Sequence, residues 1–200
     1  MIGPRSGTDT SGTCQVTKIQ GTAGTEECVV EYSTFHTVLS NVPYALVLLL
    51  GASIIVVGLG GHAWTWFAAV GFALYGMAGT FWIIVALCPH CPSYGQRSCP
   101  CGYGVVAARL RPKGDAANFS RKFRQTIPAI VPLWFIPVVI AAVSLIESFA
   151  LPLAILVGMF ALDAFILLPW LSRGHGCNAC PQRERCPWWT RKAEGRAPTG

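Results

Sequence analysis

The sequence predicts an all-α membrane protein, a four-transmembrane-helix bundle with a cysteine-rich cytoplasmic cap. Apolar residues make up 52% of the 200-residue chain and charged residues only 12%, about half the roughly 25% typical of a soluble domain. The apolar residues form long uninterrupted blocks, which is typical of membrane-spanning helices. Seven of the nine cysteines fall in two clusters, each shortly after an apolar block.

Residues 1–35 are predicted to be a flexible, polar N-terminal extension, because they are rich in Gly, Thr and Ser. They lack a basic start followed by a short apolar core, so no secretory signal is expected. Cys14 and Cys28 lie in this extension without a close companion, and the sequence leaves their role open.

Residues 36–171 are predicted to form the transmembrane domain. Its four apolar blocks are each long enough to cross a hydrocarbon layer about 30 Å thick, and they cover residues 42–60, 63–87, 127–146 and 149–171. The third block contains three prolines, which predict kinks, at Pro128, Pro132 and Pro137.

Residues 88–126 form the long loop of this domain, and the loop becomes basic after its cysteines. Asp115 is expected to cap a short helix over residues 116–125. Phe119 and Phe123 are four residues apart among basic residues, which predicts a helix lying on the membrane surface.

Basic residues predict the orientation. The loop has seven Lys and Arg residues and the tail, residues 172–200, has six, which together are 13 of the chain's 15. The short turns between the other spans have none. The positive-inside rule then places the loop and both termini in the cytoplasm, in the cell (inner) membrane. Both cysteine clusters face a reducing compartment, which favours metal ligation over disulfides.

The first cluster lies in the loop. Cys88-x2-Cys91 and Cys99-x-Cys101 are two closely spaced pairs that together offer four thiolate ligands. His90 lies between the first two cysteines and is an alternative ligand or a solvent-facing spacer.

The second cluster, Cys177-x2-Cys180-x5-Cys186, lies in the cysteine-rich cytoplasmic tail. Its spacing resembles that of the auxiliary-cluster (SPASM-type) domains of radical-SAM enzymes, over about ten residues. Thr190 stands where that family has its fourth cysteine. The missing ligand is then His175, a cysteine of the loop, or none. The chain lacks the CxxxCxxC of radical-SAM chemistry, so only a type of site is inferred.

More broadly, CPHCPSYG, CPCGYG, PLWFIP and GCNACPQRERCPWW resemble motifs of a group of uncharacterised prokaryotic four-span membrane proteins. The likeness covers most of residues 36–190. It implies the four-span architecture and no particular activity.

Three kinds of site use such cysteines. An iron–sulfur cluster, [4Fe–4S] first, is favoured, and structural zinc joining loop to tail is the alternative. A dithiol centre is the third, because Cys88-Pro-His-Cys91 resembles the active-site motif of bacterial thiol oxidants; Cys177 and Cys180 are a second candidate pair.

Asp163 is an acid inside the fourth span, about 12 Å from its end at 1.5 Å per residue. Intramembrane acids are costly, so Asp163 is a candidate for relaying a proton or contacting a quinone. The structural alternative is a neutral, protonated acid that is bonded to a neighbouring helix or lies near a hydrated interface.

The function expected is membrane electron transfer between a soluble donor and a membrane acceptor. The alternatives are a zinc-stapled anchor or assembly subunit, and a thiol–disulfide oxidoreductase. The expected partners are the lipid bilayer and other subunits or a soluble electron donor, and no nucleic acid, since basic residues beside spans are explained by orientation. The sequence leaves open whether the protein is an enzyme and which residues would be catalytic.

Overall fold

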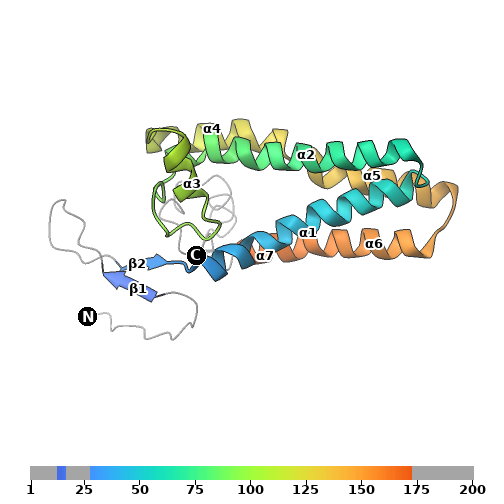
Figure 1. Ribbon diagram of the computed structural model, residues 1–200, viewed down its shortest axis with the longest axis horizontal. Coiled ribbons are helices and arrows are strands. Elements are labelled where there is room, and N and C mark those ends of the chain that lie inside the picture. Colours follow the sequence, from blue (N-terminus) through green and yellow to red (C-terminus); the bar gives the residue numbers. More distant parts are fainter. Residues whose placement is uncertain (1–12, 17–27, 173–200) are drawn as a thin grey trace, which may run out of the picture.

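A computed structural model describes residues 13–16 and 28–172, and most of these are helical. The long helices lie side by side in an elongated bundle, and the loop after α2 folds over one end of it (Figure 1). Four segments of the described chain are long and apolar enough to cross a membrane: Thr34–Gly58, Ala63–His90, Ala116–Glu147 and Leu151–Leu171. The prediction of a four-helix architecture is confirmed at this level.

The first pair of long helices is α1 (Thr34–Gly58) and α2 (Ala63–Ala86). Helix α1 begins eight residues before the predicted span because the side chain of Ser33 accepts a hydrogen bond from the amide of His36 (3.4 Å) and caps its first turn. Gly60 and Gly61 both have positive φ angles, 82° and 67°, and turn the chain into α2.

The third segment begins outside the predicted span. It consists of the 3₁₀ turn η2 (Ala116–Asn118), α4 (Phe119–Thr126), the 3₁₀ turn η3 (Ile127–Ala129) and α5 (Pro132–Glu147). Asp115 caps it as predicted, because its Oδ1 accepts from the amide of Ala117 (2.9 Å). The α-helix is interrupted between α4 and α5, where Pro128 and Pro132 lie, and α4 runs beside the end of α2 (Figure 1).

The fourth segment is α6 (Leu151–Leu162), the π-helical η4 (Asp163–Leu167) and α7 (Leu168–Leu171). A π-helix has one extra residue in its turn, and such segments are frequent at functional sites. Asp163 is the first residue of η4, so the predicted intramembrane acid coincides with this irregularity.

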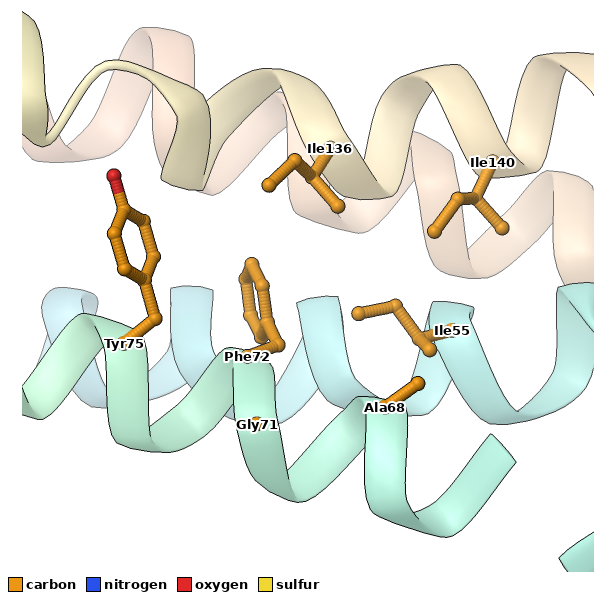
Figure 2. A pocket seen from close by; sticks show the side chains of 7 residues that line it. All are labelled: Ile55, Ala68, Gly71, Phe72, Tyr75, Ile136 and Ile140. Atoms are coloured by element: carbon orange, nitrogen blue, oxygen red, sulfur yellow. The ribbon is translucent and has the colours of Figure 1, made fainter. Parts of the chain in front are cut away.

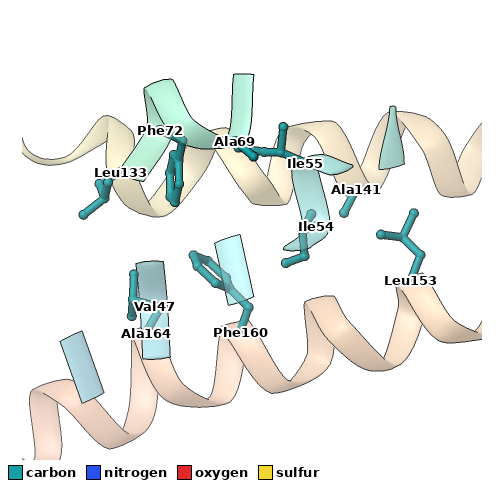
Figure 3. Packing of buried hydrophobic residues seen from close by; sticks show 10 residues of the cluster. All are labelled: Val47, Ile54, Ile55, Ala69, Phe72, Leu133, Ala141, Leu153, Phe160 and Ala164. Carbon is teal, nitrogen blue, oxygen red and sulfur yellow. The ribbon is translucent and has the colours of Figure 1, made fainter. Parts of the chain in front are cut away.

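The core lies between α1, α2, α5 and α6, and Figure 3 shows side chains of all four helices meeting there. Val47, Ile54, Leu133 and Phe160 have no exposed surface. Many large apolar side chains point outward instead, and Phe67 is 80% exposed. An apolar exterior around an apolar core is what a bundle solvated by lipid requires.

Two short strands precede the bundle. Strands β1 (Thr13–Val16) and β2 (Cys28–Glu31) pair antiparallel, with Cys14 opposite Val30 and Val16 opposite Cys28. The sequence predicted only flexible chain up to residue 35, and it gave no sign of this strand pairing. The two cysteines are not opposite each other in the register.

Candidate functional site

The loop from η1 (Cys88–His90) to α3 (Tyr103–Leu110) carries the first cysteine cluster. Each cysteine pair lies on a turn closed by the backbone. The amide of Cys91 donates to the carbonyl of Cys88 (3.1 Å), and the amide of Gly102 donates to the carbonyl of Cys99 (3.0 Å). Gly102 has a φ angle of 72°, which glycine adopts without strain.

The two turns are joined through the middle of the loop. The amide of Gly95 donates to the carbonyl of Gly104 (3.0 Å). A Cβ on Gly104 would lie only 2.3 Å from the backbone oxygen of Ser93, so the two backbones touch there. The loop therefore closes on itself and brings the start of α3 back beside the first cysteine pair.

Tyr103 marks where the cysteines come together. Burial raises the pKa of Tyr103 above its usual range, and charge at Cys101, Tyr44, Cys88 and Cys99 raises it further. Cysteines of both pairs are thus near enough to Tyr103 for their charge to act on its phenol. Burial also raises the pKa of the Cys101 thiol to about 12, with a contribution from Cys99.

Helix α1 anchors this arrangement through Asn41, which the sequence analysis missed. Its Nδ2 donates to the carbonyls of Cys101 (3.2 Å) and Thr37 (2.7 Å), and its Oδ1 accepts from the hydroxyl of Tyr103 (2.8 Å). The amide of Tyr32 donates to the carbonyl of Arg97 (3.1 Å). The loop is therefore docked on the start of α1. We call residues 88–115, docked in this way, the cysteine cap.

His90 is held on the other side of the cysteine cap. Its Nδ1 donates to the carbonyl of Asp115 (2.9 Å), since a carbonyl oxygen can only accept. The amide of Gly114 donates to the carbonyl of Pro89 (2.9 Å). With Nδ1 carrying the hydrogen, the Nε2 atom of the neutral ring keeps its lone pair and is the nitrogen able to bind a metal.

The cysteine cap gathers these groups without completing a ligand set. Within residues 31–172, no three His, Cys, Asp or Glu side chains are close enough together to hold a metal ion. No disulfide joins any two of the cap's cysteines, which are all half-buried: Cys88, Cys91, Cys99 and Cys101. The second predicted cluster, Cys177, Cys180 and Cys186, and the candidate ligand His175 lie outside the described residues.

Asp163 is separate from the cysteine cap. Its side chain is buried (5% exposed), and neither carboxylate oxygen has a hydrogen-bond partner among the described residues. The indole Nε1 of Trp134 on α5 is also buried and has no hydrogen-bond partner among the described residues. The sequence analysis singled out Asp163 and gave no sign of Trp134, which was one of several tryptophans in apolar blocks.

An apolar groove of about 270 Å³ lies between α2 and α5 over α1, lined by residues that include Phe72, Ile136 and Ile140 (Figure 2). Its polar atom is the hydroxyl of Tyr75, which already donates to the carbonyl of Ala129. The groove offers no ionisable or metal-binding chemistry of its own.

Comparison with known proteins found no matching family model, no matching curated protein and no matching solved structure. The fold by itself defines the class of protein. The described chain has four long apolar helices, as a multi-pass membrane protein would have, and a cysteine cap at one end.

Proposed function

We propose that the protein is a multi-pass membrane protein that binds one or two cysteine-ligated metal centres at its cytoplasmic face and transfers electrons there. An iron–sulfur cluster is the favoured group. The electrons would come from a soluble donor and pass toward an acceptor in the membrane. The observation that carries the proposal is the closed loop that contains both cysteine pairs and is docked on α1 at one end of the four helices.

The chemistry of the donor set fits such a group. Four thiols in one closed loop can supply soft ligands, and iron–sulfur clusters and zinc both prefer thiolates. The remaining ligands would come from Cys177, Cys180 and Cys186 of the tail, with His175 as a substitute. A bound cluster would supply a one-electron redox centre. Asn41 and Tyr103 would hold the turn that carries Cys101 in place.

The charge distribution supports the cytoplasmic assignment and the kind of donor. The cysteine cap and α4 contain all the Lys and Arg residues of the described chain, and such residues remain on the cytoplasmic side. Exposed Arg109, Arg111 and Arg121 give this end a positive surface. A soluble electron donor with an acidic face would be attracted to it.

Purification without oxygen tests this proposal. The wild-type protein is expected to be coloured and to give a redox-active signal. The double variant Cys177→Ser, Cys180→Ser should lose both, whereas the matched variant Cys14→Ser, Cys28→Ser should keep both. Equal colour in the two variants would refute the assignment of the tail cysteines.

A structural zinc site is the second candidate, and His90 is the observation that favours it. Histidine ligands of zinc typically donate their other ring nitrogen to a carbonyl or carboxylate, as His90 does to Asp115. This candidate predicts colourless protein with zinc near stoichiometry, and loss of zinc in His90→Ala. The thiol–disulfide alternative, with Cys88 and Cys91 or Cys177 and Cys180 as its pair, predicts no metal and one unusually reactive cysteine with a lowered pKa.

A further inference from the structure

The buried position of Asp163 makes the charged form of its carboxyl group energetically costly. An ionised carboxylate removed from water costs several kcal/mol or more unless it is paired and hydrogen-bonded. Both of its oxygens are buried and without a partner among the described residues. A buried acid that faces the protein interior rather than lipid is the arrangement expected of a functional intramembrane group.

Trp134 and Asp163 lie at about the same distance from the turn that joins α5 to α6. Trp134 belongs to α5, and Asp163 belongs to the fourth segment, which runs antiparallel to α5. Trp134 is 13 residues before Glu147 at the end of α5, and Asp163 is 12 residues after Leu151 at the start of α6. At 1.5 Å per residue, both are about 18–20 Å from the turn between these helices. The rings of Phe135 and Phe165, with centroids 6.1 Å apart, confirm this alignment.

Both groups belong to the core side of their helices. Trp134 packs against the buried cluster that contains Leu133 and Ala164, and Figure 3 shows Leu133 of α5 and Ala164 of η4 at the same end of that cluster. One buried group is an unpartnered donor and the other an unpartnered acceptor. The indole donor and the carboxylate acceptor could therefore satisfy each other's hydrogen-bonding needs, through one water, at the same depth of the core.

The helices packed against Asp163 supply no countercharge. Helices α1, α5, α6 and α7 and segment η4 contain no Lys or Arg. Their other titratable groups are His36 and Tyr44 on α1 and Glu147 at the far end of α5. The hydroxyl of Tyr44 already donates to the carbonyl of Gly76 (2.7 Å). A metal cation would need several oxygen ligands, and here the side chains offer one carboxylate.

We propose that Asp163 is a proton-binding site inside the membrane, and that Nε1 of Trp134 stabilises its ionised form through one bridging water. The carboxylate takes up one proton and becomes neutral, which removes the cost of the buried charge. When the proton leaves, the indole N–H donates to that water, and the water donates to the carboxylate. This proposal does not depend on the cysteine cap holding a metal.

Labelling with dicyclohexylcarbodiimide tests the proton site. The O–H of a protonated carboxyl adds across a C=N bond of this apolar reagent to give an O-acylisourea, and acyl transfer from oxygen to nitrogen then gives a stable N-acylurea that retains all the reagent's atoms. Peptide mass spectrometry of the detergent-purified protein should find the adduct at Asp163 and not at exposed Glu147. The label should be absent in Asp163→Asn, present in Asp163→Glu, and lost as pH rises through the titration.

The role of Trp134 is read from the pH profile. Removing a hydrogen-bond donor that stabilises the carboxylate raises the pKa of the carboxyl group. The pH at which labelling is lost should therefore be higher in Trp134→Phe than in wild type, by about one pH unit or more. Trp82→Phe, which changes an exposed tryptophan of α2, should leave the profile unchanged. Trp134→Tyr keeps a donor and serves if the Phe variant fails to elute as a single folded species.

Three outcomes would overturn the inference. Asp163 could remain unlabelled from about pH 5 to about pH 9, the range in which buried carboxyls titrate. Sodium ions could block the label, which would make the site a cation site. The Trp134→Phe profile could match that of wild type, which would remove the indole from the site. The Cys177→Ser, Cys180→Ser variant should label normally, so failure of the metal proposal is separable from failure of this one.

Discussion

At the scale of single residues, Asn41 connects the helical bundle to the cysteine cap. Both ends of its amide are used, since Nδ2 donates to the carbonyl of Cys101 and Oδ1 accepts from Tyr103. A part-buried amide with all these contacts fixes the position of the turn that carries Cys101. The cysteines supply the chemistry of the proposed site, and Asn41 supplies its position.

Replacing Asn41 should loosen the cysteine cap. We expect Asn41→Ala to lower the free energy of unfolding by about 1–3 kcal/mol, because it leaves the Tyr103 hydroxyl and the Cys101 carbonyl without their partner. Thermal unfolding in detergent, followed by circular dichroism, measures the change. Gln125→Ala on exposed helix surface is the matched control and should unfold like wild type. An Asn41→Ala variant as stable as this control would contradict the assigned role.

The Cys101 thiol should be slow to react in protein stripped of metal. Its pKa is raised to about 12, and the thiolate is the reactive form. The thiolate fraction, and hence the iodoacetamide rate, should increase about tenfold per pH unit from about pH 8 to about pH 10. Peptide mass spectrometry after timed alkylation measures it. A rate already at its plateau near pH 8 would show a low-pKa thiol and would contradict the buried position of Cys101.

The sequence indicated the cysteines of the site and not the residues that hold them. Cysteine spacing is local and can be read along the chain. The bond from Asn41 to Cys101 joins residues 60 positions apart, and that from Tyr103 to Asn41 joins residues 62 apart. Only the packing of the loop on α1 creates these contacts, and neither residue has a sequence signal beyond being polar near an apolar block.

At the scale of elements, close backbone contact shapes the cysteine cap. A methyl group on Gly104 would lie 2.3 Å from the backbone oxygen of Ser93, whereas one on Gly71 of α2 would meet nothing within 4 Å. The first contact joins the two cysteine turns, and the second position faces open space. The two glycines therefore form a matched pair for testing how the loop is closed.

We expect Gly104→Ala to destabilise the protein by about 1–3 kcal/mol, because backbone must move to admit the methyl group. Gly71→Ala should be neutral or stabilising by up to about 1 kcal/mol, the usual helix preference of alanine. Thermal unfolding of both variants, together with maleimide accessibility of Cys99 and Cys101, measures the difference. Equal stability and accessibility in the two variants would refute the close contact.

The long helices were predictable because apolar length is a direct requirement of crossing lipid. Their ends and interruptions were less so. Residues 34–41 are too polar to be counted in an apolar block, yet Ser33 caps them into α1. Of the three prolines expected to kink the third span, Pro128 lies in the turn η3, Pro132 is the first residue of α5, and Pro137 lies inside α5. The π-helical η4 could not be predicted from the local sequence, because a π-helix is defined by its backbone hydrogen bonds and not by its amino-acid composition.

At the scale of the whole molecule, the charge asymmetry sets one orientation. The cysteine cap and its basic residues lie at one end of the bundle, and the uncharged turn at Gly60 and Gly61 lies at the other (Figure 1). The positive-inside rule predicts that the cysteine cap lies in the cytoplasm. Metal ligation by reduced thiols depends on that orientation.

Reporter fusions test the orientation. Alkaline phosphatase, active only outside the cytoplasm, should be active when fused after Gly61 and inactive when fused after Lys113. A fluorescent protein at the C-terminus, which matures in the cytoplasm, should be bright. The reverse pattern would place the cysteines in an oxidising compartment and would favour disulfides over metal.

The central claim is that the cysteines of this membrane bundle hold an iron–sulfur cluster. The most direct test is the iron, zinc and acid-labile sulfide content of wild-type protein purified in detergent without oxygen, with its visible spectrum. We predict iron and sulfide in near-equal amounts with broad visible absorption, as a [4Fe–4S] cluster requires. Stoichiometric zinc in colourless protein, or no metal at all, would contradict the account.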